Sequence, residues 1–269
     1  MSSIEEKRVY GDAAGRTVAY VASAVGVVRV GVADDRVGEF ELVHRATARD
    51  VAGGGGLLAA ATDSDVLVGA DLDPTDFGPA VAVAVCGGGD GDAVLAAAAD
   101  GEVATLARPG DGWATRGDVP DVTGADGPLL ASADGVFRAA DGGVRRVGDL
   151  EGVRDVAAAG PYAATREGVF RFDGGEWRRE HAGDARAVAA APDGRAHAVA
   201  DGLRSRADGG WERVALPTDE SPVDVAHGPA TYAVTGRGTF LADAGEGWRS
   251  RALGVPGATA VAVPGSERV

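Results

Sequence analysis

Arginine and aspartate recur side by side at the start of several short valine-containing segments. Aligning these segments on their shared valine predicts one layer of arginines next to one layer of aspartates. The arginine layer comprises Arg49, Arg154 and Arg186, and the aspartate layer Asp50, Asp121, Asp155 and Asp224. Converging guanidinium groups could grip an anion or an acidic peptide through their forked N–H donors. A ring of carboxylates could instead hold a hard cation such as calcium or magnesium, which takes oxygen ligands.

The same two layers have a plainer interpretation. Arginine and aspartate at strand ends can pair with one another and with solvent, which would leave no binding site. The four histidines are far apart in the sequence and lack metal-ligand spacing, so no zinc site is predicted. No catalytic triad, phosphate-binding glycine loop or dinucleotide fingerprint can be placed.

A second group of candidates belongs to predicted loops on one face. His44 and His181 fall between the last strand of one repeat and the first strand of the next, and Arg166, Glu167 and Arg237 fall in turns. We expect all of them on the same face of the fold as Arg49, Arg154 and Arg186. Loops on a rigid scaffold often carry function. Ordinary surface loops remain the alternative.

A repeat explains how such distant residues could converge. A tight-turn signal follows an alanine-rich apolar run and precedes an alternating strand, at intervals of 33 to 39 residues. Its anchors are Gly26, Asp65, Gly101, Gly135, Gly168, Gly202 and Gly238. Seven copies fill the chain, and a period of this size is typical of propellers.

Each copy is predicted to form four antiparallel strands. In the clearest one these are Val153–Ala159, Tyr162–Thr165, Val169–Phe172 and Glu176–Arg179, separated by glycine-containing turns. An aromatic residue opens several fourth strands and is expected to plug the wide outer gap between blades: Phe40, Trp113, Trp177, Trp211 and Trp248. The fold class is therefore all-β, a seven-bladed β-propeller with four-stranded antiparallel blades.

The ends of the chain predict how the ring closes. The segment 258–263 matches a first strand, whereas the first copy begins near Arg16 with a second strand. The C-terminal strand should therefore complete blade one. Residues 16–263 would form one propeller, 264–269 a tail, and 1–15 an extension or an extra edge strand around Val9 and Tyr10. In the competing arrangement the segment 8–10 closes the ring.

Three turns resemble the degenerate Asp-box repeats of sialidase-like propellers. They are Phe170–Trp177, Arg206–Trp211 and Gly245–Trp248, although the Ser and Thr positions of that motif are missing. Along its whole length the chain resembles a family of small haloarchaeal β-propeller proteins. The first resemblance implies a hydrolase or lyase acting on a glycan, and the second implies no particular activity.

Composition bounds the partners and the setting. Asp and Glu outnumber Lys and Arg by 41 to 26, giving a net charge of -15, so nucleic acid is excluded as a partner. Such acidity suits a halophilic protein, because molar salt screens charges beyond about 3 Å. Cys86 is the single cysteine, and neither a signal peptide nor an apolar run long enough to span a membrane is present. We expect a soluble, cytoplasmic, monomeric protein.

Two classes of function stay open at this point. The first is a non-catalytic scaffold whose loop face and channel mouth bind a protein partner or a small acidic ligand. It requires no cofactor, unless the channel carboxylates hold calcium or magnesium. The second is the glycan-acting enzyme of the Asp-box type, and a structural subunit of a larger complex is a third alternative. The sequence favours the scaffold, because no catalytic set accompanies the platform.

Overall fold

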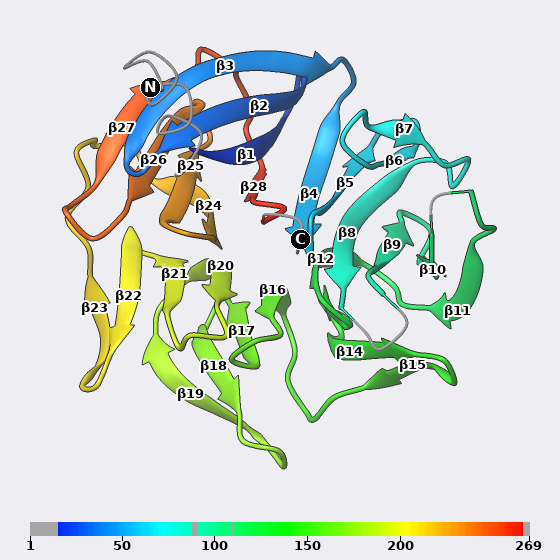
Figure 1. The fold of residues 1–269 in the computed structure, drawn as a ribbon. Helices are drawn as coiled ribbons and strands as arrows, with labels where there is room; N and C mark the ends of the chain where they lie inside the picture. The colour runs from blue at the N-terminus through cyan, green and yellow to red at the C-terminus, as the bar shows by residue number, and fades with distance from the viewer. Residues whose placement is uncertain (1–15, 88–90, 109, 266–269) are drawn as a thin grey trace, which may run out of the picture.

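Seven four-stranded antiparallel sheets stand around a central channel in the computed structural model, which describes residues 16–87, 91–108 and 110–265 (Figure 1). No helix occurs among these residues. Each sheet is a meander, so neighbouring strands along the chain are hydrogen-bonded neighbours in the sheet. The predicted seven-bladed propeller is therefore confirmed. The predicted N-terminal extension, residues 1–15, lies outside the described part of the chain, as do residues 266–269 of the predicted tail 264–269.

The strands of each blade are given from the channel outward. Blades 1 to 4 comprise β28 (Ala260–Ala262), β1 (Arg16–Ser23), β2 (Gly26–Ala33) and β3 (Arg36–His44); β4 (Ala48–Gly54), β5 (Leu57–Thr62), β6 (Val66–Val68) and β7 (Asp73–Pro74); β8 (Ala80–Cys86), β9 (Ala93–Ala98), β10 (Glu102–Leu106) and β11 (Ala114–Asp118); β12 (Val122–Asp126), β13 (Leu129–Ser132), β14 (Gly135–Ala140) and β15 (Gly143–Arg146). Blades 5 to 7 comprise β16 (Val153–Ala157), β17 (Tyr162–Thr165), β18 (Gly168–Phe172) and β19 (Trp177–Ala182); β20 (Ala185–Ala190), β21 (Ala196–Ala200), β22 (Leu203–Ala207) and β23 (Gly210–Arg213); β24 (Pro222–His227), β25 (Thr231–Thr235), β26 (Thr239–Asp243) and β27 (Arg249–Ala252).

The C-terminal strand closes the ring, as the sequence predicts. β28 pairs antiparallel with β1, with Ala22 opposite Ala260 and Tyr20 opposite Ala262. In Figure 1 the red β28 lies beside the blue β1 close to the channel. The backbone N–H of Gly56 also donates to the carbonyl of Pro264 at 2.9 Å. Blade 1 thus takes its strands from both ends of the described chain.

The core consists of apolar layers between adjacent blades. In blade 2, Ala59, Ala60 and Ala61 are all fully buried, so the small residues of this second strand face the neighbouring sheets on both sides. Small side chains let sheets approach closely near the narrow axis of a propeller. The predicted alanine-rich second strands are therefore packing elements.

Buried hydroxyl groups fix the turn that follows many second strands. In blade 5, Thr165 Oγ1 accepts the N–H groups of Glu167 and Gly168 and donates to the carbonyl of Gly168. The equivalent hydroxyl residues end the second strands of blades 1, 2, 4 and 7: Ser23, Thr62, Ser132 and Thr235. Each can satisfy the polar backbone of a tight turn without exposing it.

Tryptophan side chains fill the outer gap between blades in most of the predicted places. Trp113 Nε1 donates to the carbonyl of Thr75, and Trp177 Nε1 to the carbonyl of Val147, each in the preceding blade. Trp211 Nε1 reaches Glu180 Oε2 of the preceding blade at 3.2 Å. The prediction for Phe40 is wrong. Its side chain lies in the middle of the outer strand β3, is 36% exposed and sits beneath the guanidinium of Arg251.

Two of the predicted Asp-box-like turns have the expected carboxylate at the turn. Asp173 Oδ1 accepts the N–H groups of Gly175 and Glu176, both at 3.1 Å. Asp243 Oδ1 accepts those of Gly245 and Gly247 at 2.8 and 3.1 Å. An Asp side chain that binds backbone two or more residues ahead stabilises such a turn. These carboxylates are structural and lie at the outer strands, away from the channel.

Candidate functional site

A β-bulge shapes the first strand of blades 2 to 7. The pairing register slips by one residue near the start of each strand, for example between Ala48 and Asp50 in β4 and between Val153 and Asp155 in β16. A bulge re-aims the extra residue and often stands next to a functional site. The extra residues are Arg49, Val81, Thr123, Arg154, Arg186 and Val223. The bulges therefore put all three predicted arginines at one level.

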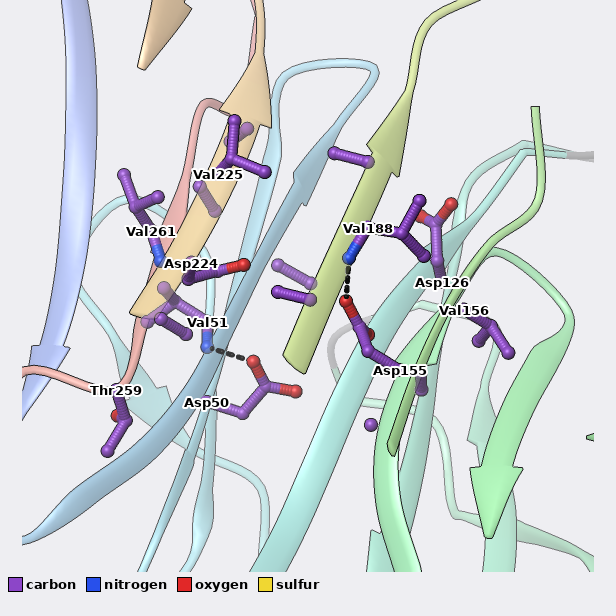
Figure 2. A pocket seen from close by; sticks show the side chains of 18 of the residues that line it. Asp50, Val51, Asp126, Asp155, Val156, Val188, Asp224, Val225, Thr259 and Val261 are labelled. Carbon is purple, nitrogen blue, oxygen red and sulfur yellow. Dashed lines mark hydrogen bonds between the residues drawn. The ribbon is translucent and has the colours of Figure 1, made fainter. Parts of the chain in front are cut away.

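The arginines and most of the aspartates line one central cavity of about 700 Å³. Its wall includes Arg49, Arg154 and Arg186 together with Asp50, Asp155 and Asp224. Figure 2 shows the three aspartates on separate first strands around the same space. Seven short segments from different blades thus bring together residues that are far apart in the sequence.

The arginines differ in what they contact. Arg154 Nη1 lies 2.8 Å from Asp184 Oδ1 and 3.2 Å from the carbonyl of Ala185, both in blade 6. Within the described part of the chain, Arg49 and Arg186 form no ion pair, and both are exposed at the mouth. Only one of the three guanidinium groups is therefore neutralised by a neighbouring carboxylate.

The aspartates bind the backbone of the next blade instead of the arginines. Asp50 Oδ2 accepts the N–H of Val83 at 3.0 Å. Asp155 Oδ2 accepts the N–H of Val188 at 2.8 Å, as the dashed line in Figure 2 shows. Asp224 Oδ2 accepts the N–H of Val261 at 2.8 Å and so ties the ring-closing strand β28 to β24. The carboxylates act as clamps between consecutive first strands.

Burial makes these carboxylates hard to ionise. It raises the pKa of Asp50 to about 7, with a further contribution from the negative charge of Asp224. It raises the pKa of Asp224 to about 6 and that of Asp155 well above its ordinary value. The backbone N–H donors act in the opposite direction but do not offset the desolvation. The aspartate layer therefore carries less negative charge near neutral pH than its composition suggests.

The prediction for Asp121 is wrong. Asp121 is exposed, lies before β12 with a positive φ of 50°, and does not line the cavity. Its neighbour Val122 begins the strand and is equivalent to Val153, whereas the position equivalent to Asp155 is Gly124. A Cβ at Gly124 would lie 2.9 Å from Asp155 Oδ1, so the missing side chain leaves room for that carboxylate.

Asp126 is a wall residue that the sequence alignment missed. Its carboxylate accepts the N–H of Ala158 in the next blade at 2.7 Å, and burial raises its pKa. It lies two residues beyond Gly124 on the same strand. In the sequence Asp126 is followed by Gly127, and this Asp-Gly pair indicates a turn at the end of a strand. It gives no indication that the carboxylate faces the channel.

The predicted loop residues do not join the channel site. Arg166 and Glu167 are exposed in the turn between β17 and β18. Arg237 lines a separate hollow of about 380 Å³ together with Glu220. His44 and His181 lie within the ends of the outer strands β3 and β19, not in the loops where the sequence analysis placed them, because these strands run further than expected.

The arrangement does not favour a hard cation. The described residues contain no group of three or more His, Cys, Asp or Glu side chains placed to hold a metal ion. The three clamp carboxylates are instead engaged by backbone N–H groups on both flanks, as with Asp50 and the N–H of Val51 at 2.9 Å. Calcium and magnesium require several oxygen ligands at once.

Comparison with protein families decides where the chain belongs. The family described as "Beta-prop_HVO_0234:-like, beta propeller" matches residues 3–264. The chain belongs to this family. The HVO_0234-like match spans all seven blades, including β28, so it agrees with the closed ring. It confirms the predicted resemblance to a small haloarchaeal-type propeller family.

Solved structures show the same fold at low identity. The chain is similar to "YCF48 bound to D1 peptide", with a TM-score of 0.55, 14% identity, and coverage of 76% of this chain and 81% of that one. It is similar to the computationally designed Ika8 protein, with a TM-score of 0.56, 15% identity, and coverage of 91% and 90%. It is also similar to apo AztD from Citrobacter koseri, with a TM-score of 0.53, 11% identity, and coverage of 90% and 83%.

Two further searches give negative results. A comparison with curated proteins finds no match. Within the described residues, no helix has the length and hydrophobicity needed to cross a bilayer.

The clamp carboxylates predict a pH-dependent stability. The folded pKa of Asp50 is about 7 against an ordinary 3.8, so the folded chain keeps a proton that the unfolded chain loses. The contribution of Asp50 to the free energy of unfolding should therefore fall as the pH rises from about 4 to about 7. One pKa unit corresponds to about 1.4 kcal/mol, so Asp50 contributes at most about 4 kcal/mol to this fall.

Asp50→Asn should flatten that dependence. Urea unfolding at pH 4, 6 and 8 is expected to show that the stability of the variant, measured relative to the wild-type chain, increases with rising pH. Contributions from histidines cancel in the difference because both chains share them. Asp111→Asn, at an exposed loop carboxyl, is the control and should follow the wild type. Parallel pH curves for wild type and Asp50→Asn would contradict the assignment.

Proposed function

We propose that this protein is a non-catalytic binding scaffold whose channel mouth takes the acidic groups of a protein partner or a small anionic ligand. One observation carries the proposal. Arg49, Arg154 and Arg186 are each the bulge residue of a first strand and open onto one cavity, and Arg49 and Arg186 have no ion-pair partner among the described residues.

Arginine is the side chain suited to this role. Its planar guanidinium presents five N–H donors in a fixed fork that matches a carboxylate or a phosphate. The bulge fixes each arginine on a strand of the rigid ring and not on a long loop, so little ordering is needed when a ligand binds. Two free guanidinium groups at one mouth favour a ligand that carries more than one acidic oxygen.

The aspartate layer weakens this site less than its sequence suggests. Asp50, Asp155 and Asp224 already accept backbone N–H groups, and their raised pKa values reduce their charge at neutral pH. An anion at the arginine level is therefore repelled less than by three fully ionised carboxylates. Binding should strengthen as the pH falls through the range in which these groups take up protons.

A peptide segment is the ligand we favour. The similar propeller described as "YCF48 bound to D1 peptide" is a peptide complex of this fold, although the analogy is one of fold alone. An acidic peptide could present two carboxylates to Arg49 and Arg186, while the turns around the mouth contact its flanks. A larger partner would also contact the proposed loop face, which comprises Arg166, Glu167, Arg237, His44 and His181.

The proposed setting is a salt-rich cytoplasm, in which the protein acts as a monomer without membrane or nucleic acid. The net charge of -15 supports this setting, because it disfavours nucleic acid and keeps the surface hydrated. The single cysteine, Cys86, is half-buried with Sγ 2.9 Å from the carbonyl of Gly127, which suits a packing role without a disulfide. Molar salt leaves only contact-range pairing between charges.

Removal of the two free arginines should weaken anion binding. We expect a tetraglutamate peptide to bind the wild-type chain in isothermal titration at 1 M KCl, and the double variant Arg49→Ala, Arg186→Ala to bind at least about tenfold more weakly. One charge-assisted hydrogen bond contributes about 1.5 to 3 kcal/mol, which supports this magnitude.

An exposed arginine away from the channel supplies the control. Arg145→Ala removes the same charge from the outer strand β15 and should leave the affinity unchanged. Inorganic phosphate should compete with the peptide. Equal affinity in the wild type and the double variant, or no binding to the wild type, would reject the proposed site.

A further inference from the structure

Two histidines from neighbouring blades meet at the far end of the channel wall. His197 belongs to β21 of blade 6, and His227 is the last residue of β24 in blade 7. Their ring centroids are 5.0 Å apart, with an angle of 49° between the ring planes. The edge of Trp248 packs against His197 with centroids 6.4 Å apart. Their separation of 30 positions in the chain hides this pair from any spacing rule.

Each ring holds a buried nitrogen that lacks a hydrogen-bond partner among the described residues. These atoms are Nδ1 of His197 and Nε2 of His227. The backbone of Ala189 lies near the His227 ring without satisfying Nε2, and Thr231 Oγ1 lies 3.4 Å from the other nitrogen, Nδ1. A buried polar atom without a partner costs about 1 to 3 kcal/mol. Because the centroids of the two rings are 5.0 Å apart, one partner between the rings would satisfy both atoms.

An imidazole binds a metal ion through the lone pair of its unprotonated nitrogen, and each of these two rings has one nitrogen that is free of a hydrogen-bond partner among the described residues.

We infer that His197 and His227 together bind a borderline transition-metal dication, such as Zn²⁺ or Cu²⁺. Imidazole suits these ions, and metal–nitrogen bonds of about 2.0 to 2.1 Å allow one ion to reach both rings at this separation. His227 also lines the central cavity. The protein supplies two ligands, in keeping with the lack of any three-residue metal cluster in the described part of the chain.

The charges around the pair are compatible with a cation. Asp243 and Asp193 act electrostatically on His197 and His227, respectively, and each favours positive charge. Arg195 acts in the opposite direction, but its guanidinium is already engaged: Nε lies 2.8 Å from Asp193 Oδ2, and Nη2 donates to the carbonyl of Gly228. This site lies on the β24 end opposite the arginine mouth and is independent of the proposed function.

Titration with Zn²⁺ tests the inference. We expect one ion per chain in 1 M potassium nitrate at pH 7.5, and at least a tenfold loss of affinity in His197→Ala and in His227→Ala. The double variant His44→Ala, His181→Ala removes the two remaining histidines and should bind like the wild type. The Arg49→Ala, Arg186→Ala variant should also retain Zn²⁺, which separates this result from the anion site. Undiminished binding in His197→Ala would overturn the inference.

A measurement on the unaltered chain covers the case in which a histidine variant does not fold. Electron paramagnetic resonance of the stoichiometric Cu²⁺ complex should show hyperfine coupling to two imidazole nitrogens. Coupling to one nitrogen or to none, or the absence of stoichiometric Cu²⁺ binding, would overturn the inference.

Discussion

A chain that ends at Gly257 is expected to lose cooperative folding, because it lacks the strand that closes the ring. Blade 1 would lose its inner strand β28, and Asp224 would lose the N–H of Val261. Val261 and Val263 are buried between blades 7 and 1, and burying one valine contributes about 1.5 to 3 kcal/mol. With the adjoining alanines the loss is about 5 kcal/mol, comparable to the whole stability of many domains.

The truncation has a matched control and a rescue. A chain that ends at Gly265 keeps β28 and should unfold like the full chain. A synthetic peptide covering 258–265 should restore cooperative thermal unfolding of the truncated chain, as followed by circular dichroism in molar salt. If the chain ending at Gly257 unfolds at the same temperature as the full chain, β28 does not close the ring.

Asp65→Ala is expected to destabilise the protein by about 3 to 5 kcal/mol. Asp65 Oδ1 accepts the N–H groups of Val66, Phe77 and Gly78, and Oδ2 accepts those of Thr75 and Asp76. Removal of the carboxylate leaves several partly buried donors without an acceptor, each costing about 1 to 3 kcal/mol. The effect should reach blade 3, because the ring of Phe77 packs at a tilt against that of Trp113, with the ring centroids 4.6 Å apart.

The measurement is urea unfolding followed by tryptophan fluorescence. Asp63→Ala is the matched control: Asp63 is exposed two residues away and accepts a single N–H, that of Thr47, at 3.2 Å. This variant should lose no more than about 1 kcal/mol. Equal losses in the two variants would show that the network around Asp65 does not hold the segment 69–79 in place.

The fold could be predicted because every blade repeats the same local chemistry. Glycine turns at constant intervals and alternating strands define the meander, and the apolar segment at the C-terminus indicates the missing first strand. The prediction that Phe40 fills the outer gap between blades was wrong because this residue lies within an outer strand that is longer than expected. The aromatic pattern alone does not show where that strand begins.

The site could be predicted only in part, because its geometry depends on the bulge. Strand alternation alone would place Arg49 and Asp50, which are adjacent in the sequence, on opposite faces of the sheet. The bulge explains why both nevertheless line the channel. Asp121 was misplaced because Val122 resembles the alignment valine but is the strand's first residue. The pairing of His197 with His227 depends on the contact between two blades, which local spacing does not encode.

A crystal structure of the protein with the tetraglutamate peptide tests the central claim most directly. We expect peptide density at the mouth of the channel, with carboxylate oxygens within hydrogen-bond distance of the guanidinium groups of Arg49 and Arg186. An empty mouth, with the peptide bound elsewhere on the ring, would contradict the proposed site.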